Sequence, residues 1–113
     1  MNYTGSVESW KEWLDLYKRG YRSVLGDFDC SYNKLTSLEF GPTSIGGYFD
    51  CSYNKLTSLE FCPISVGGSF SCVDNELTSL KGCPVSVGGS FSCAGNKLKK
   101  DEFYMACVLK GWI

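Results

Sequence analysis

The chain has 113 residues, a formal net charge of −1 and an isoelectric point near 5.3, values that fit a single domain. A charge this close to neutral argues against a general polyanion-binding protein, which needs a basic surface. No apolar run reaches the ~18 residues of a membrane span. Residues 1–20 also lack the basic-then-apolar order of a signal peptide. We therefore expect a cytoplasmic protein with neither a membrane nor a nucleic-acid partner.

Residues 1–23 are predicted to form an N-terminal helical cap. The apolar residues at helical spacing are Val7, Trp10, Trp13, Leu14 and Tyr17. Ser6 suits the N-cap and Gly20 follows the last turn, so the pattern predicts a helix over about residues 7–19. This helix is expected to cover the open edge of the first repeat, because a terminal coil exposes apolar side chains and unpaired strand groups. The alternative is that the two tryptophans form a partner-binding face.

One pattern recurs every 21 residues over residues 24–98, in copies that begin near residues 24, 45, 66 and 87. The residues that keep step are Phe28, Phe49, Phe70 and Phe91; Cys30, Cys51, Cys72 and Cys93; Asn33, Asn54, Asn75 and Asn96; and Leu35, Leu56, Leu77 and Leu98. A further apolar column contains Val24, Ile45, Val66, Val87 and Val108. Self-similarity at a short fixed period is typical of a solenoid, in which each repeat buries its apolar face against its neighbours.

Each copy predicts one short parallel strand and a turn. In the third copy, residues 69–73 form the expected strand, with Phe70 and Cys72 pointing inward. The glycine pair before it suits a tight bend or a position with φ above zero. Asn75 suits a buried turn in which its amide satisfies backbone groups of adjacent coils. Three prolines exclude a long helix from the opposite side, so we expect an α/β-type repeat solenoid with short parallel strands on one face and an irregular convex side.

Residues 99–113 are predicted to be a C-terminal cap made by varying a repeat. Asp101 suits the N-cap of a short helix over about residues 102–109. Trp112 lies 21 residues after Phe91, so residues 110–113 are expected to add a truncated fifth strand. The cap and the repeats would form one structural domain.

The repeat resembles a known family. The run Phe70-x-Cys72-x-x-Asn75-x-Leu77-x-x-Leu80 is similar to the strand-and-asparagine segment of leucine-rich repeats, although this chain has Phe and Cys where most such repeats carry Leu. The motif LTSLEF, followed by Gly or Cys and then Pro, looks like that of the short leucine-rich-repeat proteins of bacteriophages and prophages. The closing residues 110–113, Lys-Gly-Trp-Ile, match the end of those proteins. The resemblance implies a leucine-rich-repeat binding scaffold in a bacterial host cytoplasm, and its most concrete version is an inhibitor of a host defence protein.

Seven cysteines in a short chain would suggest disulfides in a secreted protein. Four of them occupy one repeat position, where a buried thiol acts as a small apolar side chain. A reducing cytosol favours free thiols. We expect a reduced column of Cys30 to Cys93, a shorter column of Cys62 and Cys83, and a core position for Cys107.

The residues that vary between copies indicate a candidate binding face. The first copies carry acidic and tyrosine residues at outward strand and turn positions, whereas the last copies carry mainly Ser, Ala and Gly. The candidate partner-binding residues are Asp27, Asp29, Tyr32, Tyr48, Asp50, Tyr53 and Asp74. Tyrosines give large contact area at low entropy cost, and clustered carboxylates attract a basic protein. The alternative is that these polar residues only keep the sheet soluble.

The sequence offers no strong catalytic pattern. It contains no histidine, which removes the usual zinc and Ser-His-Asp sites. Asp29 and Asp50 would stand one strand spacing apart, but any residue repeated every 21 positions has that spacing. We expect no enzyme activity, no cofactor and no metal site. The expected function is binding of a protein with a basic surface; the alternative is a structural solenoid that assembles as a homo-oligomer or within a larger complex.

Overall fold

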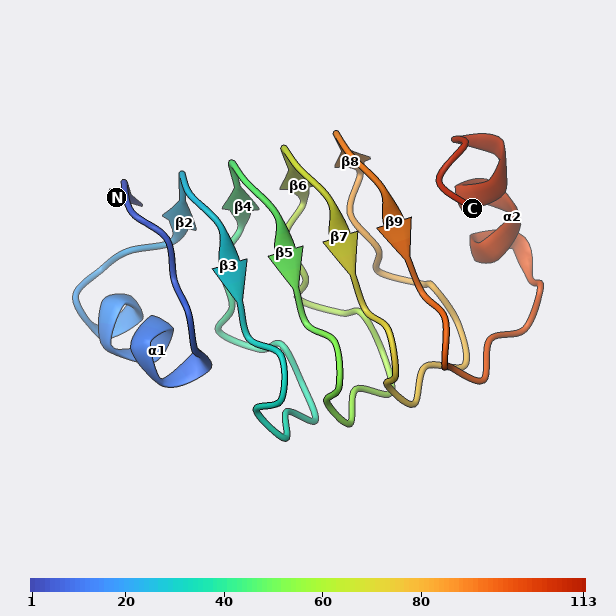
Figure 1. Cartoon of the computed structure of the whole chain (residues 1–113), viewed down its shortest axis with the longest axis horizontal. Helices are drawn as coiled ribbons and strands as arrows, with labels where there is room; N and C mark the ends of the chain where they lie inside the picture. The colour runs from blue at the N-terminus through green and yellow to red at the C-terminus, as the bar shows by residue number, and fades with distance from the viewer.

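Each repeat contributes two short strands, and neighbouring repeats pair in parallel at a spacing of 21 residues. The computed structural model describes residues 1–113 and is a parallel β-solenoid with a helix near each end, as the sequence predicts (Figure 1). The helices are α1 (Trp10–Lys18) and α2 (Glu102–Leu109). The strands are β1 (Asn2–Tyr3), β2 (Ser23–Val24), β3 (Phe28–Asp29), β4 (Ser44–Ile45), β5 (Phe49–Asp50), β6 (Ser65–Val66), β7 (Phe70–Ser71), β8 (Ser86–Val87) and β9 (Phe91–Ser92).

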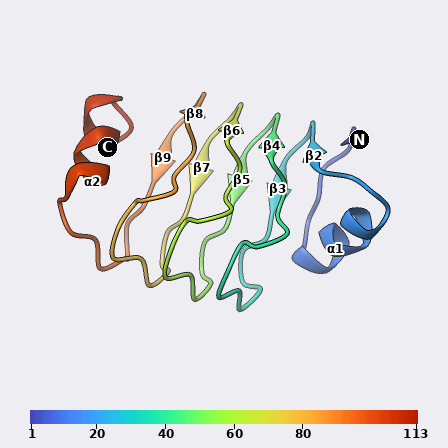
Figure 2. The ribbon, with the colours of Figure 1, turned by 180° about the vertical axis from the view of Figure 1, so that it is seen from behind.

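The strands form two parallel sheets. One has the order β1-β2-β4-β6-β8 and the other the order β3-β5-β7-β9. The sequence predicts only one strand per repeat, and the apolar column from Val24 to Val87 turns out to lie in the first sheet. Val108 does not continue this column, because it lies in α2. The connections on the opposite side contain no helix, as the prolines predict, and Figure 2 shows these irregular arcs from behind.

The 21-residue register extends into the N-terminal segment. Asn2 pairs with Ser23, and Val7 forms a bridge with Phe28. The helix therefore begins three residues later than the sequence predicts, with Ser9 and not Ser6 as its N-cap. The reason is that backbone pairing holds residues 2–7 extended: Val7 N donates to the carbonyl of Asp27 (2.8 Å).

Helix α1 closes the first end of the core. Trp13 and Leu16 are buried, and the ring of Trp13 meets the ring of Phe28 edge to face at 5.6 Å. Trp13 Nε1 also donates to the carbonyl of Phe40 at 2.8 Å. Both tryptophans contact Phe28, so these side chains are used in packing and do not form a free face.

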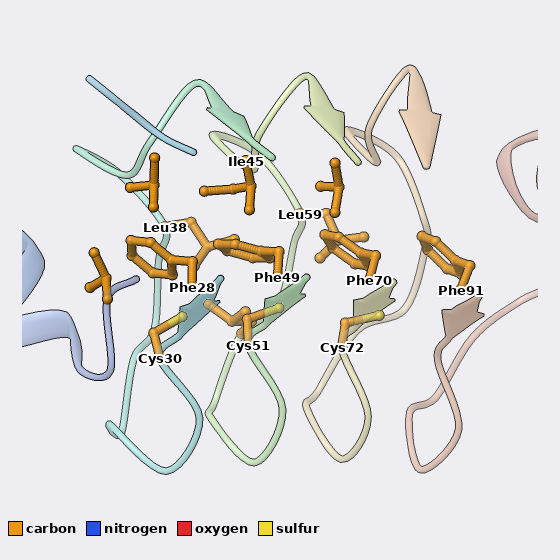
Figure 3. Packing of buried hydrophobic residues seen from close by; sticks show 14 of the residues in the cluster. Phe28, Cys30, Leu38, Ile45, Phe49, Cys51, Leu59, Phe70, Cys72 and Phe91 are labelled. Carbon is orange, nitrogen blue, oxygen red and sulfur yellow. The ribbon is translucent and has the colours of Figure 1, made fainter. Parts of the chain in front are cut away.

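The core is a set of stacked columns, as predicted. The four repeat phenylalanines stack with ring centroids 5.3, 5.5 and 5.0 Å apart, and Figure 3 shows them beside the thiols of Cys30, Cys51 and Cys72. These three thiols are fully buried, and all seven cysteines are free. Stacking in register lets each ring cover the next one, and burial of so much apolar area is the main stabilising contribution.

An asparagine ladder runs beside the phenylalanines, as the sequence predicts. The Nδ2 group of Asn75 donates to the carbonyls of Cys51 (3.0 Å) and Cys72 (3.2 Å). Its Oδ1 accepts the amide of Leu56 at 3.0 Å. The first rung differs, because the Oδ1 of Asn33 accepts the amide of Trp10 and so ties α1 to the ladder.

The glycine pairs lie at bends, which is one of the two predicted roles, and the positive-φ alternative is wrong. None of them adopts a positive φ. Instead, a Cβ atom on Gly67 would lie 2.2 Å from the carbonyl oxygen of Gly46, and one on Gly88 would lie 2.1 Å from that of Gly67. These positions need glycine because adjacent coils approach too closely there for any side chain.

The C-terminal cap is partly as predicted. Asp101 caps α2 by accepting the amides of Phe103 and Tyr104. The ring of Trp112 continues the aromatic column by stacking on Phe91 at 5.3 Å. However, residues 110–113 form no fifth strand, because Trp112 N bonds the carbonyl of Cys107 at the end of the helix and does not pair with β9. Neither helix of the chain has the length and apolarity needed to cross a bilayer.

Candidate protein-binding face

The predicted site residues lie on and beside the sheet β3-β5-β7-β9, where the structure divides them into two clusters. The strand cluster contains Asp27, Asp29, Tyr48 and Asp50. The turn cluster contains Tyr32, Tyr53 and Asp74, which follow the strands. No hydrogen bond or ring contact joins the two clusters.

The strand cluster places a tyrosine among carboxylates. Tyr48 is exposed, and Asp29 pairs with Asp50 in register on the neighbouring strand. Partial desolvation, together with the negative charges of Asp29, Asp27 and Asp50, raises the pKa of the Tyr48 hydroxyl. A tyrosine hydroxyl is protonated at neutral pH even without this shift, so it can donate a hydrogen bond.

A shallow hollow lies beside this tyrosine. It has a volume of about 350 Å³ and is lined by Tyr48, Phe49, Asp50, Ser69 and Ser71. One wall is thus acidic and aromatic, while the other carries two small hydroxyl side chains. This shape suits an inserted long side chain that ends in a positive charge.

The turn cluster is an exposed aromatic stack. The rings of Tyr32 and Tyr53 lie nearly parallel, at an interplanar angle of 6°, with their centroids 4.5 Å apart. Their exposed fractions are 71% and 46%. Closeness to Tyr32 and to the carboxylate of Asp74 raises the pKa of the Tyr53 hydroxyl. Two flat rings beside a carboxylate offer both a stacking surface and an acceptor for a guanidinium group.

The backbone holds these tyrosines in a costly conformation. Tyr32 and Tyr53 both have φ of 57°, and the equivalent position of the last coil is Gly95 with φ of 72°. Glycine adopts the left-handed region without steric cost, whereas a tyrosine pays about 1 kcal/mol or more. The third coil has Asp74 at this position with φ of 54°, so the turn accepts other side chains, but it does not require a tyrosine and does not account for the two exposed rings.

The aspartates of the strand cluster also have structural roles. The Oδ1 of Asp27 accepts the amide of Tyr48 at 2.9 Å. The Oδ1 atoms of Asp29 and Asp50 accept the amides of Ser31 and Ser52, each at 2.9 Å. One oxygen of each carboxylate therefore shapes the local chain. The aspartates thus have a structural role that requires no partner, and this role does not extend to the tyrosine stack.

Sequence reasoning missed one acidic residue of this face. Glu8 lies 21 residues before Asp29 and is exposed. Its charge contributes to the raised pKa of Tyr48. The signal is the spacing Glu8–Asp29–Asp50, but the apolar helical spacing of residues 7–17 dominates this segment and predicts a cap.

The thiols do not form a reactive site. Burial raises the pKa of Cys62 to about 12 and raises that of Cys51 well above the ordinary value of 9.0. A protonated thiol is a poor nucleophile. Cys107 is buried in the core, as predicted, with its sulfur 3.8 Å from that of Cys83.

No protein-family model matches the chain, and no curated protein or solved structure matches it either.

Proposed function

We propose that the chain is a non-enzymatic protein-binding solenoid whose acidic, tyrosine-rich face binds a basic protein surface. The observation that carries the proposal is the Tyr32–Tyr53 stack, exposed and held at left-handed backbone positions where glycine would cost less. The adjacent carboxylates supply the complementary charge.

The face suits binding because its main parts are ordered before a partner arrives. The tyrosines are stacked and the aspartates are held by backbone amides, so few side chains lose freedom on binding. Arginine is the side chain best matched to this surface, because its guanidinium stacks on aromatic rings and bonds carboxylates. The solenoid would sterically block the part of the partner's surface that lies against the sheet.

A finer proposal concerns origin and target. We propose a leucine-rich-repeat protein of the phage or prophage type, which acts in the host cytoplasm by binding and inhibiting a host protein, with a defence protein as the first candidate. This proposal is supported by the resemblance of the repeat motif to the motif of that family. The acidic face is compatible with such a role, because proteins that act on nucleic acids commonly present basic surfaces.

The test is recovery of a partner from bacterial cytoplasm by the tagged chain, with mass spectrometry to identify what is bound. The variant Tyr32→Gly with Tyr53→Gly keeps the turn, since Gly95 occupies the same position naturally. A matched control is Phe40→Gly with Phe61→Gly, because these exposed aromatic residues on the irregular side also have positive φ. We expect a stoichiometric partner that the tyrosine variant loses and the phenylalanine variant retains.

Charge is tested separately with Asp29→Asn and Asp50→Asn, which keep an Oδ1 acceptor for Ser31 and Ser52. Binding should weaken in this double variant and should fall as salt is raised. Equal recovery by all variants would contradict the proposal. A multimer of the chain without any partner would favour the self-assembling solenoid instead.

A further inference from the structure

The last coil ends in unpaired backbone donors. At every junction between repeats, at least four amides of one coil donate to oxygens of the next: the phenylalanine amide, as in Phe70 N to Ser90 O (2.8 Å), and three that follow it. At the last junction these three bonds run from Cys72 N to Ser92 O (2.9 Å), from Asp74 N to Ala94 O (2.9 Å) and from Leu77 N to the Oδ1 of Asn96 (3.0 Å). Cys93, Gly95 and Leu98 hold the equivalent donor positions, and no coil follows them.

These three residues line a groove. It has a volume of about 420 Å³ and lies between the open edge of the last coil and the C-terminal cap, where Tyr104 and Ile113 form the far wall. Cys93 and Leu98 are only half-buried, whereas their equivalents Cys72 and Leu77 are completely buried. The groove therefore lacks the cover that a further coil gives elsewhere, and it remains open to an occupant.

The groove admits one strand and not a complete second solenoid. The position of a fifth phenylalanine is already filled by Trp112, which stacks on Phe91, and α2 occupies space beyond the last coil (Figure 1). Another copy of the chain cannot stack flush on this end. A single extended segment beside Cys93 to Leu98 would lie within the groove, against Tyr104 and Ile113.

The charged residues around the groove indicate which kind of segment it would bind. Lys100 lines the groove, Lys97 and Lys99 are exposed next to it, and the side-chain carboxylate against the groove lining is that of Asp74, beside Gly95. Unpaired N–H groups and ammonium groups both need acceptors. The complementary ligand is rich in oxygen atoms and negative in charge.

We propose that this groove binds an extended acidic peptide segment of another protein, which takes the place of the missing coil. By analogy with Ser92, Ala94 and Asn96, the segment offers main-chain carbonyls at positions i and i+2 and an Asn or Asp side-chain oxygen at i+4. Position i+1 points inward, as Cys93 does, and takes a small apolar residue. The site adjoins the acidic face at Asp74, which lies against Gly95, but it has the opposite charge preference.

The test uses a peptide in register and its positional isomer. The probe is acetyl-Asp-Ser-Val-Ala-Gly-Asn-Glu-amide, in which Ser, Ala and Asn supply the three oxygens. The control, acetyl-Asp-Ser-Val-Ala-Asn-Gly-Glu-amide, has the same composition but moves the side-chain oxygen by one residue. Titration into the full chain is followed by backbone amide NMR and by hydrogen exchange.

We expect the amides of Cys93, Gly95 and Leu98 to shift and to exchange more slowly with the probe. The isomer should bind about tenfold more weakly, because the Leu98 amide loses its acceptor. Lys100→Glu should weaken the probe about tenfold, while Lys55→Glu in an earlier coil should leave it unchanged.

Equal affinity for the two peptides, or shifts that map to other amides, would overturn the proposal. Shifts of the same three amides with protein concentration, without peptide, would show that a second copy takes the groove and would overturn it as well. None of these outcomes bears on the acidic face, whose test uses different residues.

Discussion

The side chain of Asn75 makes hydrogen bonds that no apolar residue at this position could replace. It is 6% exposed, donates to the carbonyls of Cys51 and Cys72 in two coils, and accepts the amide of Leu56. Removing its amide leaves buried polar groups without partners, which costs about 2–4 kcal/mol in total. We expect Asn75→Ala to lower the free energy of unfolding by that amount in urea titrations.

The matched control is Asn96→Ala. Asn96 is half-exposed at the last coil, so water can replace part of its bonding. Its loss should be clearly smaller. Equal losses at the two positions would mean that burial does not set the strength of the ladder.

The thiols give the chain a predictable loss of stability in alkali. Burial holds the pKa of Cys62 at about 12 in the folded chain, while an ordinary thiol ionises near 9.0. The unfolded chain therefore releases this proton first as pH rises, so stability present below about pH 9 falls between about pH 9 and 12. We expect urea unfolding at about pH 7 and pH 10 to show this fall. Cys62→Ser should reduce the pH dependence, and an unchanged dependence would rule out this thiol as a cause.

At the scale of elements, α1 is an anchored cap. Trp13 is completely buried, packs edge to face on Phe28 and donates to Phe40. Trp13→Ala creates a cavity and leaves the Phe40 carbonyl unpaired, so the expected loss is about 3–5 kcal/mol in thermal or urea unfolding. Trp10→Ala, at a half-buried position, should cost less. The opposite order would show that Trp10, and not Trp13, holds the helix to the first coil.

In the molecule as a whole, the short distance between neighbouring coils determines which substitutions the solenoid tolerates. A methyl group on Gly67 would lie 2.2 Å from the carbonyl oxygen of Gly46, and this backbone cannot move without separating two coils. We expect Gly67→Ala to cost about 3 kcal/mol, measured by urea unfolding. Thr78→Ala changes an exposed side chain in the same coil and should cost well under 1 kcal/mol. A mild effect of Gly67→Ala would mean that the coils are less closely coupled than the structure shows.

Much of the fold could be predicted from the sequence because a fixed period places each residue over its equivalent. Phe28, Phe49, Phe70 and Phe91 must stack once successive coils pair in parallel, and the same holds for the cysteines and asparagines. Outward positions follow from strand alternation, which explains why Asp29, Tyr48 and Asp50 could be assigned to one face. The cap helices were visible in their apolar spacing and in Asp101.

Other features depend on backbone contacts that leave little trace in side-chain patterns. The pairing of residues 2–7 is made by main-chain groups, so the first coil and the place of Glu8 on the acidic face could not be read from apolar spacing. The φ values of Tyr32 and Tyr53, the close approach at Gly67 and the absence of a fifth strand are likewise set by how coils meet. The sequence by itself determined the period, the columns and the sign of the exposed face. Only the tertiary structure decided where the register begins, how the face divides and which donors remain open at its end, because those depend on distances between backbones and not on residue types.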